Sequence, residues 1–225
     1  MKRALLFSAA AMAAGLLTAA AVVGPELLSG YRFMDALDRY YAGYEANGGA
    51  WPQIQDSCAL CHGVNGQPRD AQYAALAGQP AAYIETQLHA FAEGRRRSAQ
   101  MGPLAANLSD TQIKSLADYF SRQRPETTEA PERDDALAKR GEAVVAARGC
   151  IACHGERLSG GPLGPRIAGQ GEGYLSDQLK AFKHGQRQDP AQAMNAMASS
   201  LSDEELKATV HYLSGLAPTQ PHSAH

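Results

Sequence analysis

The chain has 225 residues, a formal net charge of −2 and 44% hydrophobic residues. This length allows one or two compact domains. The near-neutral charge gives no sign of the excess of basic residues that is typical of nucleic-acid-binding proteins, so we expect no nucleic acid among its partners.

The first 28 residues have the features of an export signal. Two basic residues, Lys2 and Arg3, precede an uncharged run rich in alanine and leucine over residues 4–23, and small residues allow cleavage after Ala21. The run is also just long enough to span a bilayer. Residues 1–28 are therefore expected to be a signal peptide or a membrane anchor, with the rest of the chain in the periplasm, either soluble or tethered to the outer face of the inner membrane.

Residues 29–55 form an extension that is rich in tyrosine, contains Trp51 and matches nothing later in the chain. We expect a helix packed on the domain that follows it, or a spacer from an anchor. A docking element for a partner is the alternative.

Every cysteine lies in one of two Cys-x-x-Cys-His motifs: Cys58, Cys61 and His62, and Cys150, Cys153 and His154. In this motif the two thiols form thioethers to the haem vinyl groups, and the histidine reaches the iron. Two such motifs with no spare cysteine predict two covalently bound haem c groups.

Other uses of these cysteines are less well supported. Zinc sites usually place their Cys-x-x-Cys pairs close together, whereas these pairs are far apart and each is followed directly by histidine. A thioredoxin-like pair would need a strand-rich unit, and no stretch alternates like a strand. Zinc binding and disulfide pairing are the alternatives that stay open.

The segment after each motif repeats the same pattern, which indicates internal duplication. The matching positions are Ala77-Gly78-Gln79 with Ala168-Gly169-Gln170, Tyr83 with Tyr174, Gln87 with Gln178, Phe91 with Phe182, Leu108-Ser109-Asp110 with Leu201-Ser202-Asp203, and Tyr119 with Tyr212.

The first repeat, residues 56–124, is predicted to be helical. Ile84 and Leu88 lie on one helical face, and Ser109 with Gln112 forms the signature of a capping box. A domain of this size has a small core, so a buried haem is expected to supply apolar contact that the chain lacks.

The second repeat, residues 136–217, follows the same plan. A helix is expected from Leu137 to Ala147, leading into the second haem motif, and Ser202 with Glu205 forms another capping box. Glycine and proline crowd residues 159–165, which favours a loop around a flat cofactor.

Three polar segments are expected to be exposed to solvent. Residues 125–135 are acidic and hold two prolines, which predicts an exposed linker, and residues 218–225 are a polar tail. The basic run Arg95-Arg96-Arg97 is expected to be a solvated helix end, with pairing to a haem propionate as the alternative.

The sixth iron ligand is predicted from the repeat. Met101 is the only methionine of repeat 1 after its haem motif, and Met194 stands at the same distance before the Leu-Ser-Asp segment of repeat 2. Met101 is expected to lie in a polar loop flanked by glycine and proline rather than on a helix stripe. Met197 answers Leu104, which favours core packing. The histidines considered as alternative ligands do not recur, because His89 answers Lys180 and His184 answers Glu93. We therefore expect the axial pairs His62 with Met101 and His154 with Met194.

This ligation points to electron transfer. A thioether is a soft, neutral donor that favours ferrous iron and raises the reduction potential. Two protein ligands on each iron leave no open position for a substrate, so we expect no catalytic residues. A dihaem enzyme would need one iron with a displaceable ligand.

The ordered set of motifs over about residues 56–217 resembles the dihaem cytochrome c4 family. The resemblance implies an all-α protein with two tandem cytochrome c-like domains, each wrapping one haem, packed about a pseudo-twofold axis. It also implies a periplasmic respiratory carrier that delivers electrons to a terminal oxidase, commonly from a quinol-oxidising complex; a dehydrogenase is the other expected donor. The alternative is a haem-bearing subunit of a larger membrane oxidoreductase.

The resemblance also draws attention to one difference between the repeats. Family members usually carry a proline before the Ala-Gly-Gln segment, and its carbonyl accepts a hydrogen bond from the proximal histidine ring. Repeat 2 has Pro165, whereas repeat 1 has Ala74 at the matching place. The Ala74 carbonyl can serve the same purpose from a less rigid loop, so we hypothesise that the two haems are inequivalent.

Overall fold

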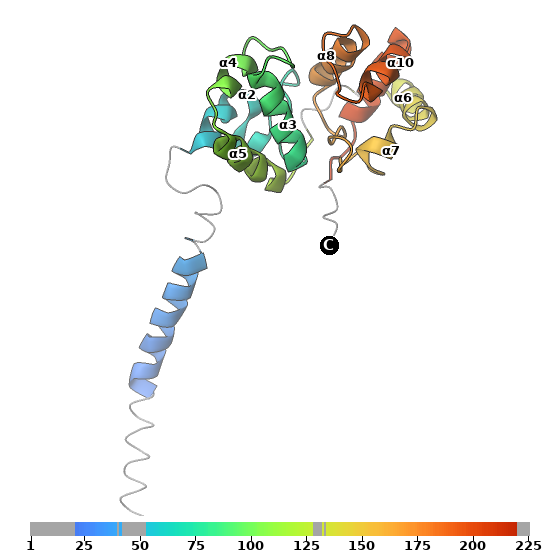
Figure 1. The fold of residues 1–225 in the computed structure, drawn as a ribbon. Helices are drawn as coiled ribbons and strands as arrows, with labels where there is room; N and C mark the ends of the chain where they lie inside the picture. Colours follow the sequence, from blue (N-terminus) through green and yellow to red (C-terminus); the bar gives the residue numbers. More distant parts are fainter. Residues whose placement is uncertain (1–20, 40, 42–52, 128–131, 133, 220–225) are drawn as a thin grey trace, which may run out of the picture. The chain divides into compact units, whose positions relative to one another are not determined.

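The structure is a computed structural model that describes residues 21–39, 41, 53–127, 132 and 134–219 (Figure 1). The chain divides into two compact units, Met1–Trp51 and Pro52–His225. All regular secondary structure among the described residues is helical, which confirms the predicted all-α class.

In the first unit, residues 21–39 form a helix whose side chains are mostly exposed, including Leu27 and Tyr31. Most of the predicted signal or anchor, and much of the extension at 29–55, lie outside the described residues. Within the part of the chain that the structure describes, no helix is both long and apolar enough to cross a membrane.

Domain 1 is the first half of the second unit. It contains, in chain order, the 3-10 helix η1 (Ile54–Cys58), α2 (Ala59–His62), the 3-10 helix η2 (Val64–Gly66), α3 (Ala81–Ala92), α4 (Met101–Ala106) and α5 (Asp110–Arg122). Its core forms where α3, α4 and α5 meet, around Ile84, Leu88, Ile113 and Phe120. The helix α5 starts at the predicted capping box of Ser109 and Gln112.

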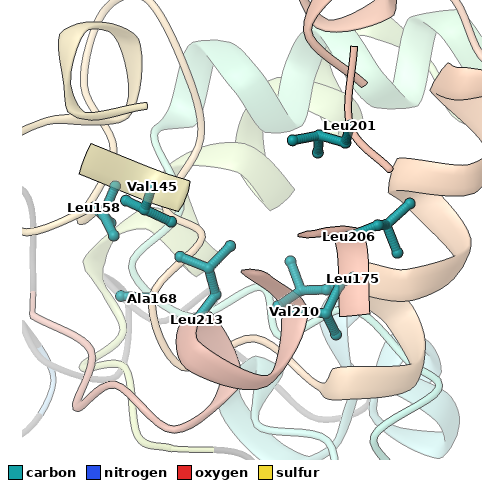
Figure 2. Close-up of a cluster of buried hydrophobic side chains, with 8 residues drawn as sticks. All are labelled: Val145, Leu158, Ala168, Leu175, Leu201, Leu206, Val210 and Leu213. Atoms are coloured by element: carbon teal, nitrogen blue, oxygen red, sulfur yellow. The ribbon is translucent and has the colours of Figure 1, made fainter. Parts of the chain in front are cut away.

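Domain 2 repeats this arrangement. It contains α6 (Asp135–Ala147), α7 (Ile151–His154), α8 (Glu172–Lys183), α9 (Ala193–Ser199) and α10 (Asp203–Ser214). Figure 2 shows its core, in which Val145 of α6 and Leu175 of α8 join the apolar face of α10. The second predicted capping box is also present, with Ser202 and Glu205 at the start of α10.

The two domains differ in the segment that precedes the haem motif. In domain 2, α6 packs closely across α10 at Gly141, where a Cβ atom would overlap the Ala208 carbonyl oxygen and lie 2.6 Å from Cβ of Tyr212. In domain 1, the described residues directly before α2 form only the short helix η1, which packs on α5. Domain 2 therefore has a long helix–helix contact for which the described part of domain 1 shows no counterpart.

Residues 125–135 differ from the expected exposed linker at their first residue. Pro125 is buried, and its ring packs on Gly78, as the ring of Pro218 packs on Gly169 in domain 2. Each proline thus packs on the Ala-Gly-Gln segment of its own repeat. The predicted domain boundaries otherwise stay predictions.

Two arginines, one from each domain, form equivalent hydrogen bonds across the domain interface. Arg96 of domain 1 lies over the Phe91 ring, bonds Gln87 of its own domain at 2.8 Å, and crosses to Tyr174 and Gln178 at 3.1 and 2.8 Å. The expectation that the Arg95–Arg97 run is a solvated helix end is therefore wrong for Arg96, because the facing domain supplies acceptors that a single repeat lacks.

Arg187 makes the matching set from the other side. It lies over the Phe182 ring, bonds Gln178 at 2.7 Å, and crosses to Tyr83 and Gln87 at 3.0 and 2.9 Å. The two arginines therefore exchange equivalent bonds across the domain interface.

Two glutamines complete this interface. The Gln79 side chain accepts from the Arg166 N–H at 3.0 Å and donates to the Arg166 carbonyl at 2.9 Å. The Gln170 side chain accepts from the Ala75 N–H at 2.9 Å and donates to the Ala75 carbonyl at 2.8 Å. Each amide thus satisfies one backbone donor and one acceptor that are buried between the domains.

Candidate haem sites

Each Cys-x-x-Cys-His motif forms one tight helical turn, α2 or α7, that ends at a glycine. Gly63 has φ 73° and Gly155 has φ 81°, a region that favours glycine. A Cβ atom at Gly63 would also overlap the Gln67 carbonyl oxygen. The chain can therefore turn sharply just after each proximal histidine.

Within each turn, the two thiols have different surroundings. Cys58 and Cys150 pack against the domain cores, whereas Cys61 and Cys153 are exposed. Burial raises the pKa of both the Cys58 and the Cys150 thiol. All four cysteines are free thiols, so the disulfide alternative is not what the structure shows.

The proximal histidines are held in matching geometry. Nδ1 of His62 lies 2.8 Å from the Ala74 carbonyl oxygen, and Nδ1 of His154 lies 2.8 Å from that of Pro165. The contact predicted for Ala74 is therefore confirmed. A carbonyl can only accept, so Nδ1 carries the proton and the lone pair of each neutral ring lies on Nε2.

Burial also favours the neutral, metal-binding form of these rings. Desolvation lowers the pKa of His62, against the opposing effect of its bond to Ala74, and Arg96 lowers it slightly further. Desolvation likewise lowers the pKa of His154. Both rings thus keep a lone pair that is available to iron at neutral pH.

The methionines lie in helices rather than in the loop expected for Met101. Met101 is the first residue of α4 and packs on the domain 1 core, against which Cys58 also packs. Met194 is the second residue of α9. The glycine and proline that follow Met101 suggested a loop, but both fit the first helical turn, where backbone N–H groups need no intrahelical acceptor.

Side chains just before these helices position the methionines, and sequence reasoning missed them. Ser98 Oγ accepts from the Met101 N–H at 3.1 Å. Asp189 accepts from the Ala193 N–H at 2.9 Å and from the Met194 N–H at 3.4 Å. Their types are common helix caps, but only the fold shows which backbone groups they reach.

The donor set fits haem c. Each domain offers two free thiols within one helical turn, a histidine with its tautomer fixed and a thioether, which is the set that a covalently attached, low-spin haem uses. The zinc alternative finds no support, since the described residues contain no cluster of three His, Cys, Asp or Glu side chains that could hold a bare metal ion.

Comparisons with known proteins agree with this geometry. The Cytochrome c family profile matches twice, over residues 52–123 and 138–217. Cytochrome c4 of Thiocapsa roseopersicina is 34% identical over 71% of this chain and 87% of its own length. The chain belongs to the dihaem cytochrome c4 family.

Two further relatives extend the comparison. The crystal structure of reduced recombinant cytochrome c4 from Pseudomonas stutzeri superimposes with a TM-score of 0.65 at 30% identity, covering 72% of this chain and 94% of that one. The thiosulfate dehydrogenase electron acceptor of Thiomonas intermedia is 37% identical, over 80% of this chain and 88% of its own.

Membership settles the cofactor and the class of activity. The family carries two covalently bound haem c groups, and its members transfer electrons rather than catalyse a reaction on a substrate. This chain is accordingly a dihaem electron-transfer protein.

Proposed function

We propose that the chain is a periplasmic electron carrier in which each domain holds one haem through its own motif and one methionine. The thioether residues are Cys58 and Cys61, and Cys150 and Cys153; the axial pairs are His62 with Met101, and His154 with Met194. The observation that supports this assignment most directly is the histidine–carbonyl contact, which is 2.8 Å in both domains.

A bound haem c supplies a one-electron Fe³⁺/Fe²⁺ couple. The protein's own residues set how that couple behaves. The Ala74 and Pro165 carbonyls orient the histidine rings and increase their basicity, and Ser98 and Asp189 hold the backbone beside the methionines. Two protein ligands on each iron favour electron transfer over bond-making chemistry.

The interface between the two domains is held by buried hydrogen bonds. Buried hydrogen bonds from Gln79, Gln170 and Arg187 join the domains, so the domains would hold two bound haems at a fixed separation. A fixed separation favours relay of electrons from one domain to the other over independent action of each.

The partners are proposed from the relatives. A thiosulfate dehydrogenase is the electron donor that the Thiomonas relative suggests, and a terminal oxidase is the acceptor that the family resemblance implies. A quinol-oxidising complex is the other donor. The alternative of a haem-bearing subunit of a larger membrane complex is favoured by the long apolar run at residues 4–23 and by the tyrosine-rich extension at residues 29–55.

Axial ligation is tested by replacing Met101 or Met194 with alanine. Each change should remove one of two methionine–iron charge-transfer bands and lower the potential of one haem, while the matched control Met197→Ala leaves both bands. Loss of a band in Met197→Ala would contradict the assignment in domain 2. Intact mass of the native protein reports haem number and leader cleavage together.

The partners are tested by reduction kinetics. The oxidised protein should be reduced rapidly by a purified thiosulfate dehydrogenase with thiosulfate, or by a quinol-oxidising complex with quinol, and then be oxidised by a terminal oxidase. Purification only as part of a membrane complex would instead support the subunit alternative.

A further inference from the structure

The peptide group between Ala74 and Ala75 has one partner in each domain. Its carbonyl oxygen lies 2.8 Å from Nδ1 of His62 and accepts the proton of that ring. Its N–H, which belongs to Ala75, donates to Oε1 of Gln170 in domain 2 at 2.9 Å. One planar amide group therefore links the proximal histidine of domain 1 to a side chain of domain 2.

The peptide group between Pro165 and Arg166 has the same two kinds of partner with the domains exchanged. Its carbonyl oxygen lies 2.8 Å from Nδ1 of His154, and its N–H donates to Oε1 of Gln79 in domain 1 at 3.0 Å. Each proximal histidine is thus joined, through a single peptide group, to a glutamine of the opposite domain.

Both glutamines are shielded from water and held in one orientation. Gln79 and Gln170 are each 3% exposed, and Ala75 and Arg166, whose N–H groups they bind, are 0% exposed. Each side-chain Nε2 also donates to the carbonyl of the same residue, at 2.8 Å for Ala75 and 2.9 Å for Arg166. Hydrogen bonds in such a dry environment are electrostatically stronger than in water.

The bond on the N–H side of the peptide group affects the bond on its carbonyl side. An acceptor at the N–H shifts electron density towards the carbonyl oxygen, so hydrogen bonds in a chain strengthen one another. A stronger acceptor at Nδ1 raises the basicity of the opposite ring nitrogen, Nε2, which is the nitrogen left free for iron. A more basic ligand favours ferric over ferrous iron, because the ferric ion carries the higher positive charge.

We propose that Gln170 is a positioning residue that lowers the reduction potential of the domain 1 haem, and that Gln79 does the same for the domain 2 haem. The inference rests on the proposed axial ligation by His62 and His154. Each glutamine acts through the peptide group that holds the histidine of the opposite domain. The potential of each haem therefore depends on contact between the two domains.

A purely structural role of these glutamines predicts a different pattern. Gln170 ends the segment of domain 2 that begins at Pro165, whose carbonyl holds His154. Loosening of that segment alone would disturb the domain 2 haem, whereas loss of the bond to Ala75 acts on the domain 1 haem. The domain in which the potential changes thus separates the two roles.

Replacement of Gln170 by methionine removes mainly the bond on the N–H side. Methionine has a similar length and no charge, and it offers no strong acceptor. The Ala75 carbonyl keeps another donor, because Nη2 of Arg166 lies 3.2 Å from its oxygen. The Ala75 N–H is therefore the one group of that residue left without its partner by Gln170→Met.

The test measures both haem potentials by spectroelectrochemical titration of the intact dihaem protein, with each potential assigned to its domain by NMR. Gln170→Met should shift the domain 1 equilibrium about threefold towards the reduced state, about 28 mV for one electron, with a smaller shift in domain 2. Gln79→Met should give the reverse pattern. The matched control Tyr83→Phe removes a bond from Arg187 across the same interface, and should leave both potentials unchanged.

A larger shift in the domain that carries the substitution would overturn the proposal, as would equal shifts in Gln170→Met and Tyr83→Phe. Intact mass verifies first that each variant carries both haems. A wild-type protein whose NMR spectra show an iron ligand other than His62 or His154 would instead refute the proposed haem sites.

A second measurement uses the wild-type protein and does not depend on folding of a variant. In the reduced, isotope-labelled protein, NMR should detect scalar couplings across hydrogen bonds from the Ala75 nitrogen to the side-chain carbonyl carbon of Gln170, and from the Arg166 nitrogen to that of Gln79. The Leu76 N–H, which donates to the Gly66 carbonyl at 2.9 Å within domain 1, is the positive control. Absence of both cross-domain couplings while the control is seen would overturn the proposal.

Discussion

In domain 2 the helix α6 packs across α10 before the chain reaches Cys150, whereas in domain 1 the five residues that end at Cys58 form the 3-10 helix η1. The haem motifs and histidine contacts of the two domains nevertheless match. Domain 2 also carries Arg166 where domain 1 has Ala75, and Arg166 reaches into domain 1. The same histidine geometry thus occurs beside a long helix–helix contact in domain 2 and beside η1 in the described part of domain 1. Domain 1 also receives part of its support from domain 2.

The largest effect should come from the α6–α10 contact. Gly141→Val would place a side chain where the Ala208 carbonyl and Tyr212 already lie. Backbone cannot move aside as a flexible side chain can, so we expect domain 2 to lose about 3 kcal/mol or more of unfolding free energy. Chemical denaturation followed through the two charge-transfer bands measures each domain separately.

The control for this variant is Gly30→Ala, at another helical glycine, where a Cβ atom would meet nothing within 4 Å. It should not destabilise either domain. An equal loss of stability in domain 1 and domain 2 on Gly141→Val would show that the α6–α10 contact supports the whole protein rather than domain 2.

The interface arginines allow a second comparison. Arg187 is only 8% exposed, and Arg187→Met would leave the Tyr83 hydroxyl and Gln87 amide without one buried partner. We expect a loss of about 1–3 kcal/mol of unfolding free energy. Arg96→Met should cost less, because Arg96 is less buried. Thermal unfolding of both variants, and of the double variant, measures this, and a larger loss for Arg96→Met would contradict the ranking.

The proximal loops should give a smaller difference. Pro165→Ala loosens the loop whose carbonyl holds His154, and we expect about 0.4–1 kcal/mol lower stability through the greater entropy of the unfolded chain. The hypothesis that the haems are inequivalent predicts distinct potentials and distinct proximal histidine NMR signals in the wild type. Equal potentials together with identical histidine environments would refute it.

The smallest effect concerns the capping boxes. Domain 1 uses Gln112, which does not titrate, and domain 2 uses Glu205. Hydrogen bonding to the Ser202 N–H, and then the bond from Arg148, lower the pKa of Glu205 below its ordinary value. A lowered folded-state pKa means that this stabilisation is present above the unfolded pKa, about 4.3, and is lost as pH falls through the folded pKa.

Domain 2 should therefore weaken more than domain 1 in acid, and Glu205→Gln should reduce that difference. Unfolding temperature against pH measures it. Part of the dependence should persist in the variant, because the Lys183 amine lowers the pKa of Asp203, and the Leu137 N–H lowers that of Asp134. An unchanged pH profile in Glu205→Gln would assign the acid sensitivity to those two groups.

Local sequence signals predicted much of this structure. The repeat alignment found both capping boxes and the carbonyl of Ala74 as a histidine acceptor, because these depend on neighbours in the chain or on matching positions. Ser109 and Ser202 act within one helical turn, so their role can be inferred from spacing alone.

The interface could not be predicted in the same way. Gln79 and Gln170 served only as markers of the repeat, although each binds backbone of the other domain. Arg96 was likewise expected to belong to a solvated basic run, although it bonds Gln178 of the other domain. A single repeat supplies only some of the partners of these side chains, so their role in the interface emerges only when two repeats face one another.

The reciprocal bonds of Arg96 and Arg187 have the form of an isologous contact between two copies of one chain. A single-haem ancestor that carried one such arginine, tyrosine and glutamine would have made this contact twice over in a symmetric homodimer. From such a homodimer, gene fusion would need only to add a linker to an existing assembly. Once the halves were joined, each could mutate alone, and a cation such as Arg166 could be fixed on one side only.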